Sequence, residues 1–165
     1  AARQRDHLEA TDVDSPVGAA SPGRRLDLQR GGADQPGRGR MGGDRSLAIF
    51  FGSQTGNAAG LAEKTAKMAA DYGLVPTVYD MDGFDASKLN SHPRTLIITS
   101  TWGEGEMPDN AETLWNTVSS GKPSLANVHF SVCAIGDSSY DEFCKAGTDW
   151  DDKYVELGAS RIHEI

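Results

Sequence analysis

Short apolar runs separated by segments of helical spacing are the feature of this sequence that most restricts its fold. Residues 47–51 and 95–100 are apolar or β-branched almost throughout, as expected of strands buried on both faces of a sheet. Residues 76–80 and 129–135 predict two further strands, and residues 160–165 predict the beginning of a fifth.

Three segments between these runs have the spacing of helices. Residues 57–72 are the first, and Gly73 follows as a stop signal. Helices are also expected at residues 110–119 and 140–157. The face of the first helix that we expect to be buried consists of Ala58, Leu61, Ala62, Thr65, Met68 and Ala69. Strands that alternate with helices predict an α/β three-layer sandwich around a parallel sheet.

Residues 1–45 differ in composition from the rest of the chain. They are rich in Arg, Gly, Asp, Pro and Ala and contain no aromatic residue, so we expect a disordered linker or tail before a domain at 46–165. They hold eight Arg and seven acids, whereas residues 46–165 hold eight Lys or Arg and seventeen acids. Because this excess of acid repels nucleic-acid phosphates, the composition disfavours a nucleic-acid partner and suits a basic protein partner.

Cysteine usage and hydropathy predict a cytoplasmic protein. Cys133 and Cys144 form no CxxC pair and have no His cluster with zinc-ligand spacing nearby, so reduced thiols and no metal are expected. No apolar run reaches the roughly 18 residues of a membrane span. The N-terminal residues also lack the apolar segment of a secretory signal.

Three loops follow predicted strands, and ligands of open parallel sheets bind at the carboxyl ends of strands. The first loop contains Ser53, Gln54, Thr55, Gly56, Asn57 and Ala58. Hydroxyl groups, a glycine and a helix N-terminus favour binding of a phosphate there. The loop lacks the Lys of a Walker motif and the GxGxxG of a dinucleotide fold, which disfavours a nucleoside triphosphate or NAD. A plain helix cap is the alternative.

The second and third loops each carry an aromatic residue beside glycine. Trp102 lies in the Gly-rich segment 100–110, and Tyr140 lies in 135–144 after Gly136 and Asp137. Aromatic side chains beside glycines favour close contact with a planar ring. A tight turn with one exposed Trp is the alternative for the second loop. The three loops together predict a slot for a flat ring joined to a phosphate.

These motifs carry a family resemblance. Ser-Gln-Thr-Gly-Asn-Ala (53–58), Ser-Thr-Trp-Gly-Glu-Gly-Glu (100–106) and Gly-Asp-Ser-Ser-Tyr-x-x-Phe-Cys (136–144), in this order and spacing, resemble the FMN domain of diflavin reductases. Within that family the sequence from Leu47 onward is most similar to the flavoprotein alpha subunit of NADPH-sulfite reductase. The resemblance implies a flavodoxin-like fold with five parallel strands in the order 2-1-3-4-5, truncated at the C-terminus.

The resemblance also implies the cofactor and its contacts. FMN would bind with its phosphate on residues 53–58. The ring and ribityl chain would lie against Ser100, Thr101, Trp102, Gly103, Ile135, Gly136, Asp137, Ser138, Ser139, Tyr140, Asp141, Glu142, Phe143 and Cys144. No residue would act on a substrate as acid, base or nucleophile. One departure is Trp102, because the sulfite reductase subunit usually has a polar residue there and the microsomal cytochrome reductase an aromatic one.

The implied function is electron transfer by an oxidoreductase component. Electrons would pass from NADPH through FAD, on a reductase module that residues 1–165 lack, to FMN and then to an acceptor such as a hemoprotein. A basic acceptor could dock on acids that flank the ring, and a solvated helix face is the alternative reading of these acids. They are Asp109, Glu112, Asp141, Glu142, Asp149, Asp151 and Asp152.

Three other functions are left open or disfavoured. A free-standing flavodoxin shuttle and a flavin-free interaction module are the two alternative readings. A response-regulator receiver would share the sheet, but it needs paired acids after the first strand and an Asp after the third, which residues 50–52 and 100–101 do not supply.

Overall fold

Five parallel strands form one sheet in the order β2-β1-β3-β4-β5, as the resemblance implies. The computed structural model describes residues 43–165, so nearly all of the expected tail at 1–45 lies outside the described residues. The strands are β1 (Ser46–Gly52), β2 (Val75–Asp80), β3 (Arg94–Ser100), β4 (His129–Ile135) and β5 (Ser160–Arg161).

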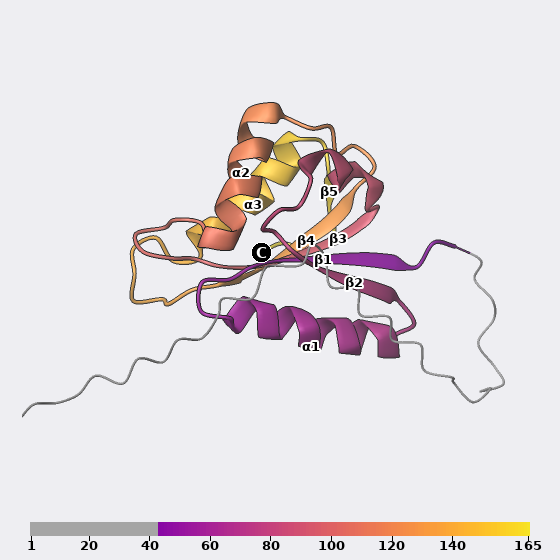
Figure 1. Ribbon diagram of the computed structural model, residues 1–165, viewed down its shortest axis with the longest axis horizontal. Coiled ribbons are helices and arrows are strands. Elements are labelled where there is room, and N and C mark those ends of the chain that lie inside the picture. Colours follow the sequence, from indigo (N-terminus) through magenta and orange to yellow (C-terminus); the bar gives the residue numbers. More distant parts are fainter. Residues whose placement is uncertain (1–42) are drawn as a thin grey trace, which may run out of the picture.

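Helices cover both faces of the sheet and complete the predicted three layers. In Figure 1, α1 (Asn57–Asp71) lies on one face, and α2 (Asp109–Gly121) and α3 (Lys145–Glu156) lie on the other. The side of α1 that faces the sheet consists of Ala58, Ala62 and Ala66, each no more than 1% exposed. Met68 is 53% exposed, so its place in the predicted buried face is wrong. Small alanines at a spacing of four bring α1 close to the strands, and Met68 lies outside that stripe.

Large aromatic side chains fill the core between the sheet and the other two helices. Trp150 is 1% exposed, and its ring packs edge-on against Trp115 with the ring centroids 5.0 Å apart. Tyr154 packs against Phe130 of β4 at 5.1 Å. None of the helices within residues 43–165 is long and apolar enough to cross a membrane.

The connection from β2 to β3 is a short 3-10 helix, η1 (Ala86–Ser91), which the sequence does not predict. It begins where the Asp85 carboxylate accepts a hydrogen bond from Ser87 N at 3.0 Å. Beside it, the ring of His92 packs against those of Phe50, Tyr79 and Phe84.

Two predicted boundaries near the C-terminus are wrong. The last helix begins at Lys145 and not at Tyr140, because residues 137–144 form turns. The Asp137 carboxylate accepts bonds from Ser139 N and Oγ, and such local bonds compete with helix formation. The fifth strand spans Ser160–Arg161 alone, and residues 162–165 are exposed.

Arg161 anchors this edge strand to α3. Its Nε donates to Asp151 Oδ1 at 3.0 Å, and its Nη2 donates to Asp151 Oδ2. Asp151 is 3% exposed, so the expectation that it belongs to a docking surface is wrong. Its carboxylate is committed to this ion pair, because a buried charge requires a partner.

Candidate functional site

The strand register brings the three predicted loops to one edge of the sheet. Gly52 of β1 lies opposite Thr99 of β3, and Ser100 lies opposite Ile135 of β4, so the three strands end at the same level. Thr101 joins the second and third loops. Its N–H donates to Ile135 O at 2.9 Å, and its Oγ1 accepts from Ala146 N at 3.2 Å.

The first loop presents backbone donors at the N-terminus of α1. Gly56 precedes the helix with φ +89°, a left-handed conformation that glycine adopts without strain. Ser53 Oγ accepts a bond from Ala58 N at 3.2 Å. The N–H groups of Gln54, Thr55, Gly56, Asn57 and Ala59 have no acceptor among residues 43–165. Because the first turn of α1 carries no acid, these free donors favour an anion.

Two residues of this loop also contact the start of α2. Ser53 N donates to Asn110 Oδ1 at 2.7 Å. The Gln54 side chain exchanges two bonds with Asp109, each 2.9 Å long. Asn110 is not among the site residues that the sequence predicts. Its partner in the loop is 57 positions away, and only the choice of a polar residue at the start of a helix hints at its role.

The second loop is a closed turn that presents Trp102. Trp102 N donates to Glu106 O at 3.0 Å, and Glu106 N donates to Trp102 O at 2.8 Å. Gly103 and Gly105 both have positive φ, which permits the tight reversal, and Glu104 lies between them. Trp102 is 51% exposed, which fits the alternative of a tight turn with one exposed Trp and also leaves its ring face accessible to a ligand.

The third loop combines an ionised carboxylate with a neutral thiol. Hydrogen bonds from Ser139 N and Oγ hold the pKa of Asp137 below its ordinary value. Burial, and secondarily the neighbouring Cys133, raises the pKa of the Cys144 thiol. Cys144 therefore stays protonated near neutral pH and does not have the character of a reactive thiolate.

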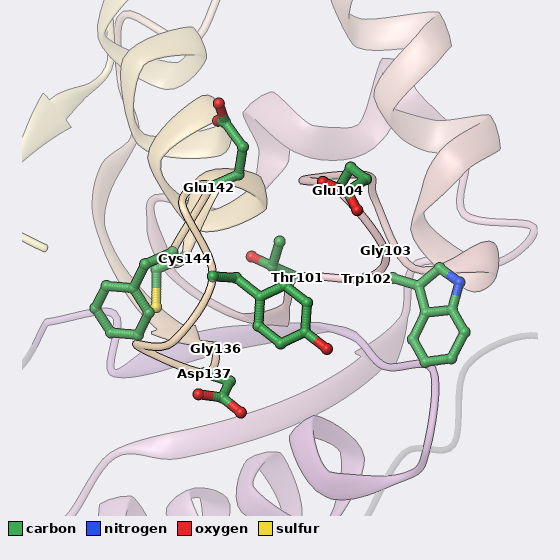
Figure 2. Close-up of a pocket in the computed structure, with 10 residues that line it drawn as sticks. Thr101, Trp102, Gly103, Glu104, Gly136, Asp137, Glu142 and Cys144 are labelled. Atoms are coloured by element: carbon green, nitrogen blue, oxygen red, sulfur yellow. The ribbon is translucent and has the colours of Figure 1, made fainter.

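These two loops enclose a cavity of about 420 Å³. Figure 2 shows Trp102 and Gly103 on one side of it and Cys144 and Asp137 on the other. Trp102, Tyr140 and Phe143 expose 51%, 57% and 52% of their surfaces beside it, which is unusual for three large aromatic residues. The lining consists of Thr101, Trp102, Gly103, Glu104, Gly136, Asp137, Tyr140, Glu142, Phe143 and Cys144.

The lining agrees with the predicted contact set in part. It includes Glu104, which is absent from that set. Predicted residues outside the lining are those of the first loop and Ser100, Ile135, Ser138, Ser139 and Asp141. Ser100 and Ile135 belong to strands, where Ser100 Oγ donates to Gly52 O at 3.5 Å.

The cavity lining is rich in acidic and aromatic side chains. Among residues 43–165, three acids and no Lys, Arg or His line the cavity, and the nearby Lys145 pairs with Asp149 at 2.7 Å. The lining offers no nucleophile with an adjacent base. Residues 43–165 contain no cluster of three or more His, Cys, Asp or Glu that could hold a metal ion.

A parallel sheet in the order 2-1-3-4-5, with its ligand-type loops where the strand order reverses between β1 and β3, is the architecture of the flavodoxin-like fold. The sequence profile of that family agrees, because the flavodoxin profile matches residues 49–165. The chain belongs to the flavodoxin family.

Curated relatives are more specific about the branch of the family. The chain is 42% identical over 119 residues to the sulfite reductase [NADPH] flavoprotein alpha-component of Bacillus subtilis, across 72% of this chain and 20% of the relative. It is also 42% identical over 117 residues to the protein of the same name from Thiocapsa roseopersicina, across 70% of this chain and 22% of the relative. The chain thus spans about a fifth of the length of these relatives.

Solved structures match the same part of the chain. Flavodoxin 2 from Bacillus cereus superposes with a TM-score of 0.66 at 27% identity and covers 73% of this chain and 83% of its own. A flavodoxin from Streptococcus pneumoniae has the same TM-score at 33% identity and covers 72% of this chain and 81% of its own.

Proposed function

We propose that this chain binds FMN and serves as the FMN domain of a diflavin reductase of the sulfite reductase flavoprotein type. The observation that carries the proposal is the juxtaposition at one sheet edge of free amide donors and an aromatic-lined cavity. The donors suit a phosphate, and Trp102 and Tyr140 suit the faces of a planar ring. FMN when bound would supply the redox chemistry, accepting electrons and releasing them singly or in pairs.

The residues present fit this cofactor. Five amides, those of Gln54–Asn57 and Ala59, have no acceptor within residues 43–165 and can satisfy a monophosphate without a Lys or a metal ion. Gly136 would place its backbone next to the ring, since the cavity wall there has no side chain. Glu104, Asp137 and Glu142 line the cavity and oppose the arrival of further negative charge. They would therefore disfavour electron uptake by a bound ring.

The rest of the proposal concerns parts beyond this site. FAD and NADPH would bind a separate reductase module, and a basic acceptor, such as the hemoprotein partner of a sulfite reductase, would receive the electrons. Residues 1–45 would form a tail or linker before the domain at 46–165. A cytoplasmic location completes the proposal.

The test of FMN binding is a visible spectrum after the chain is mixed with FMN and desalted. Retained flavin bands with quenched fluorescence are expected. A colourless protein, with the fold verified by circular dichroism, would contradict the proposal and favour a flavin-free interaction module. Riboflavin in a parallel sample reports how much of the binding depends on the phosphate.

A free-standing flavodoxin shuttle is the second candidate, because the chain covers more than four fifths of two flavodoxin structures. Sequencing the transcript beyond the codon of Ile165 separates the two candidates. A reductase module in the same reading frame supports the diflavin assignment. A stop codon soon after the domain supports the shuttle.

A further inference from the structure

The side chain of Asn110 connects three segments at the phosphate-type loop. Its Oδ1 accepts from Ser53 N at 2.7 Å. Its Nδ2 donates to Asp80 Oδ1 at 2.8 Å and to Phe51 O at 3.3 Å. The partners determine the orientation of the amide, because a flipped amide would place its NH₂ against the Ser53 N–H and its oxygen against two acceptors.

The residue before it makes a second connection to the same loop. Asp109 N donates to Gln54 Oε1, and Asp109 Oδ2 accepts from Gln54 Nε2. The first two residues of α2 thus hold two consecutive residues of the loop. Both polar groups of the Gln54 side chain are therefore engaged with α2.

These hydrogen bonds restrict the movement of the loop at residues 53–58 relative to α2. Asn110 is followed by Ala111, and Leu114 lies one turn later, at 0% and 3% exposure in the core. Because α2 is fixed by this packing, Asn110 fixes where the loop begins. The amides of residues 54–57 follow directly, so their directions depend on the backbone at Ser53. Groups that orient a binding shell in this way typically change affinity by about 10- to 100-fold when removed from metal sites.

We propose that Asn110, assisted by the Gln54–Asp109 pair, is a positioning residue that makes the site selective for phosphorylated over unphosphorylated flavin. The inference rests on the proposed FMN site. Asn110 would not touch the phosphate itself, because its two polar atoms are already occupied by protein groups. It would hold the free amides in a convergent arrangement before the ligand arrives.

The test compares the dissociation constants of FMN and riboflavin, measured by flavin fluorescence quenching, in wild type and Asn110→Ala. We expect the constant for FMN to rise about tenfold and that for riboflavin to change less than about twofold, because riboflavin has no phosphate. Asn116→Ala is the matched control, since Asn116 lies exposed on the same helix and its side chain makes no hydrogen bond within residues 43–165. It should leave both constants unchanged.

Gln54→Ala provides a second variant, because Asn110→Ala could unfold the chain. It removes only the paired contact with Asp109 and should shift the FMN-to-riboflavin ratio in the same direction by a smaller factor. Equal weakening of both ligands, or no weakening of either, in both variants would overturn the positioning role while leaving the FMN site intact. Failure of the folded wild type to bind either flavin would overturn the proposed function and the inference with it.

Discussion

Gly136 lies where the third loop comes close to the start of α3. A Cβ atom at this position would lie 2.9 Å from Cys144 N and 3.0 Å from Cys144 Sγ. One of these neighbours is backbone, so it cannot move aside at low cost. The absence of a side chain at Gly136 therefore allows the loop to fold back and form the cavity wall.

Gly136→Ala should lower the free energy of unfolding by about 1–3 kcal/mol through overpacking. Gly60→Ala is the control, because nothing lies within 4 Å of a Cβ there and the residue is inside α1. It should be neutral or stabilising by up to about 1 kcal/mol. Urea denaturation of both variants measures the difference, and equal effects would contradict the close-approach argument.

Stacking of Trp102 on the flavin ring is a second property that a single substitution can test. Trp102→Ala should weaken FMN binding by about 3- to 10-fold, the range of an aromatic stacking contact, whereas Trp102→Phe should retain most of the affinity. Thermal stability should change little in either variant, because the side chain is 51% exposed. Unchanged affinity in Trp102→Ala would show that this side chain does not stack on the ring.

At the scale of elements, the regular patterns were predictable and the local turns were not. The apolar runs of β1, β3 and β4 and the alanine spacing of α1 are repeating signals, so these elements appear close to where they are expected. The late start of α3 depends on the bonds of one carboxylate, Asp137, and η1 depends on the cap at Asp85. Neither the late start of α3 nor the presence of η1 produces a repeating pattern of residue types that can be recognised in a single sequence.

The aromatic cluster beside η1 predicts a pH dependence of stability. Burial among the rings of Phe50, Tyr79 and Phe84 lowers the pKa of His92 below its ordinary value of 6.5. Below that pH the unfolded chain binds a proton that the folded chain resists, so stability must fall as pH decreases. Above about pH 6.5, His92 is neutral in both the folded and the unfolded chain, so it no longer lowers the stability of the folded state.

His92→Phe should therefore lose less stability than wild type between about pH 7 and pH 5. His129→Gln is the control, because His129 is exposed at the start of β4. Denaturation midpoints at several pH values measure the effect. Parallel pH profiles for wild type and His92→Phe would contradict this account of the cluster.

At the scale of the whole molecule, the sheet order and the shared edge of the loops were predictable from topology. The contacts that stiffen that edge were not, because Asn110 and Ser53 are 57 positions apart in the sequence and their hydrogen bond leaves no local pattern. Asp151 is the opposite case. The acidic residues next to Asp151 in the sequence suggest a solvated helix face. In the folded chain, however, its carboxylate is buried and pairs with Arg161 of β5.

The charge of residues 46–165 predicts how the domain would associate with the proposed basic acceptor. Electron transfer from the FMN-loaded chain to cytochrome c, a basic haem protein used as a probe, should slow steadily as salt is raised to ~0.5 M, because screening removes steering. Stopped-flow measurements of the bimolecular rate check this. A rate indifferent to ionic strength would rule out docking through the acidic face.

The most direct test of the FMN site is a ¹H–¹⁵N correlation spectrum of the labelled chain, recorded before and after addition of FMN. We predict the largest amide shifts in residues 54–59, 101–105 and 136–144, the three loops that the sheet brings to one edge. Riboflavin should reproduce the shifts of the second and third loops and leave residues 54–59 nearly unchanged. Shifts that cluster elsewhere, or no shifts in a folded chain, would contradict the proposed site.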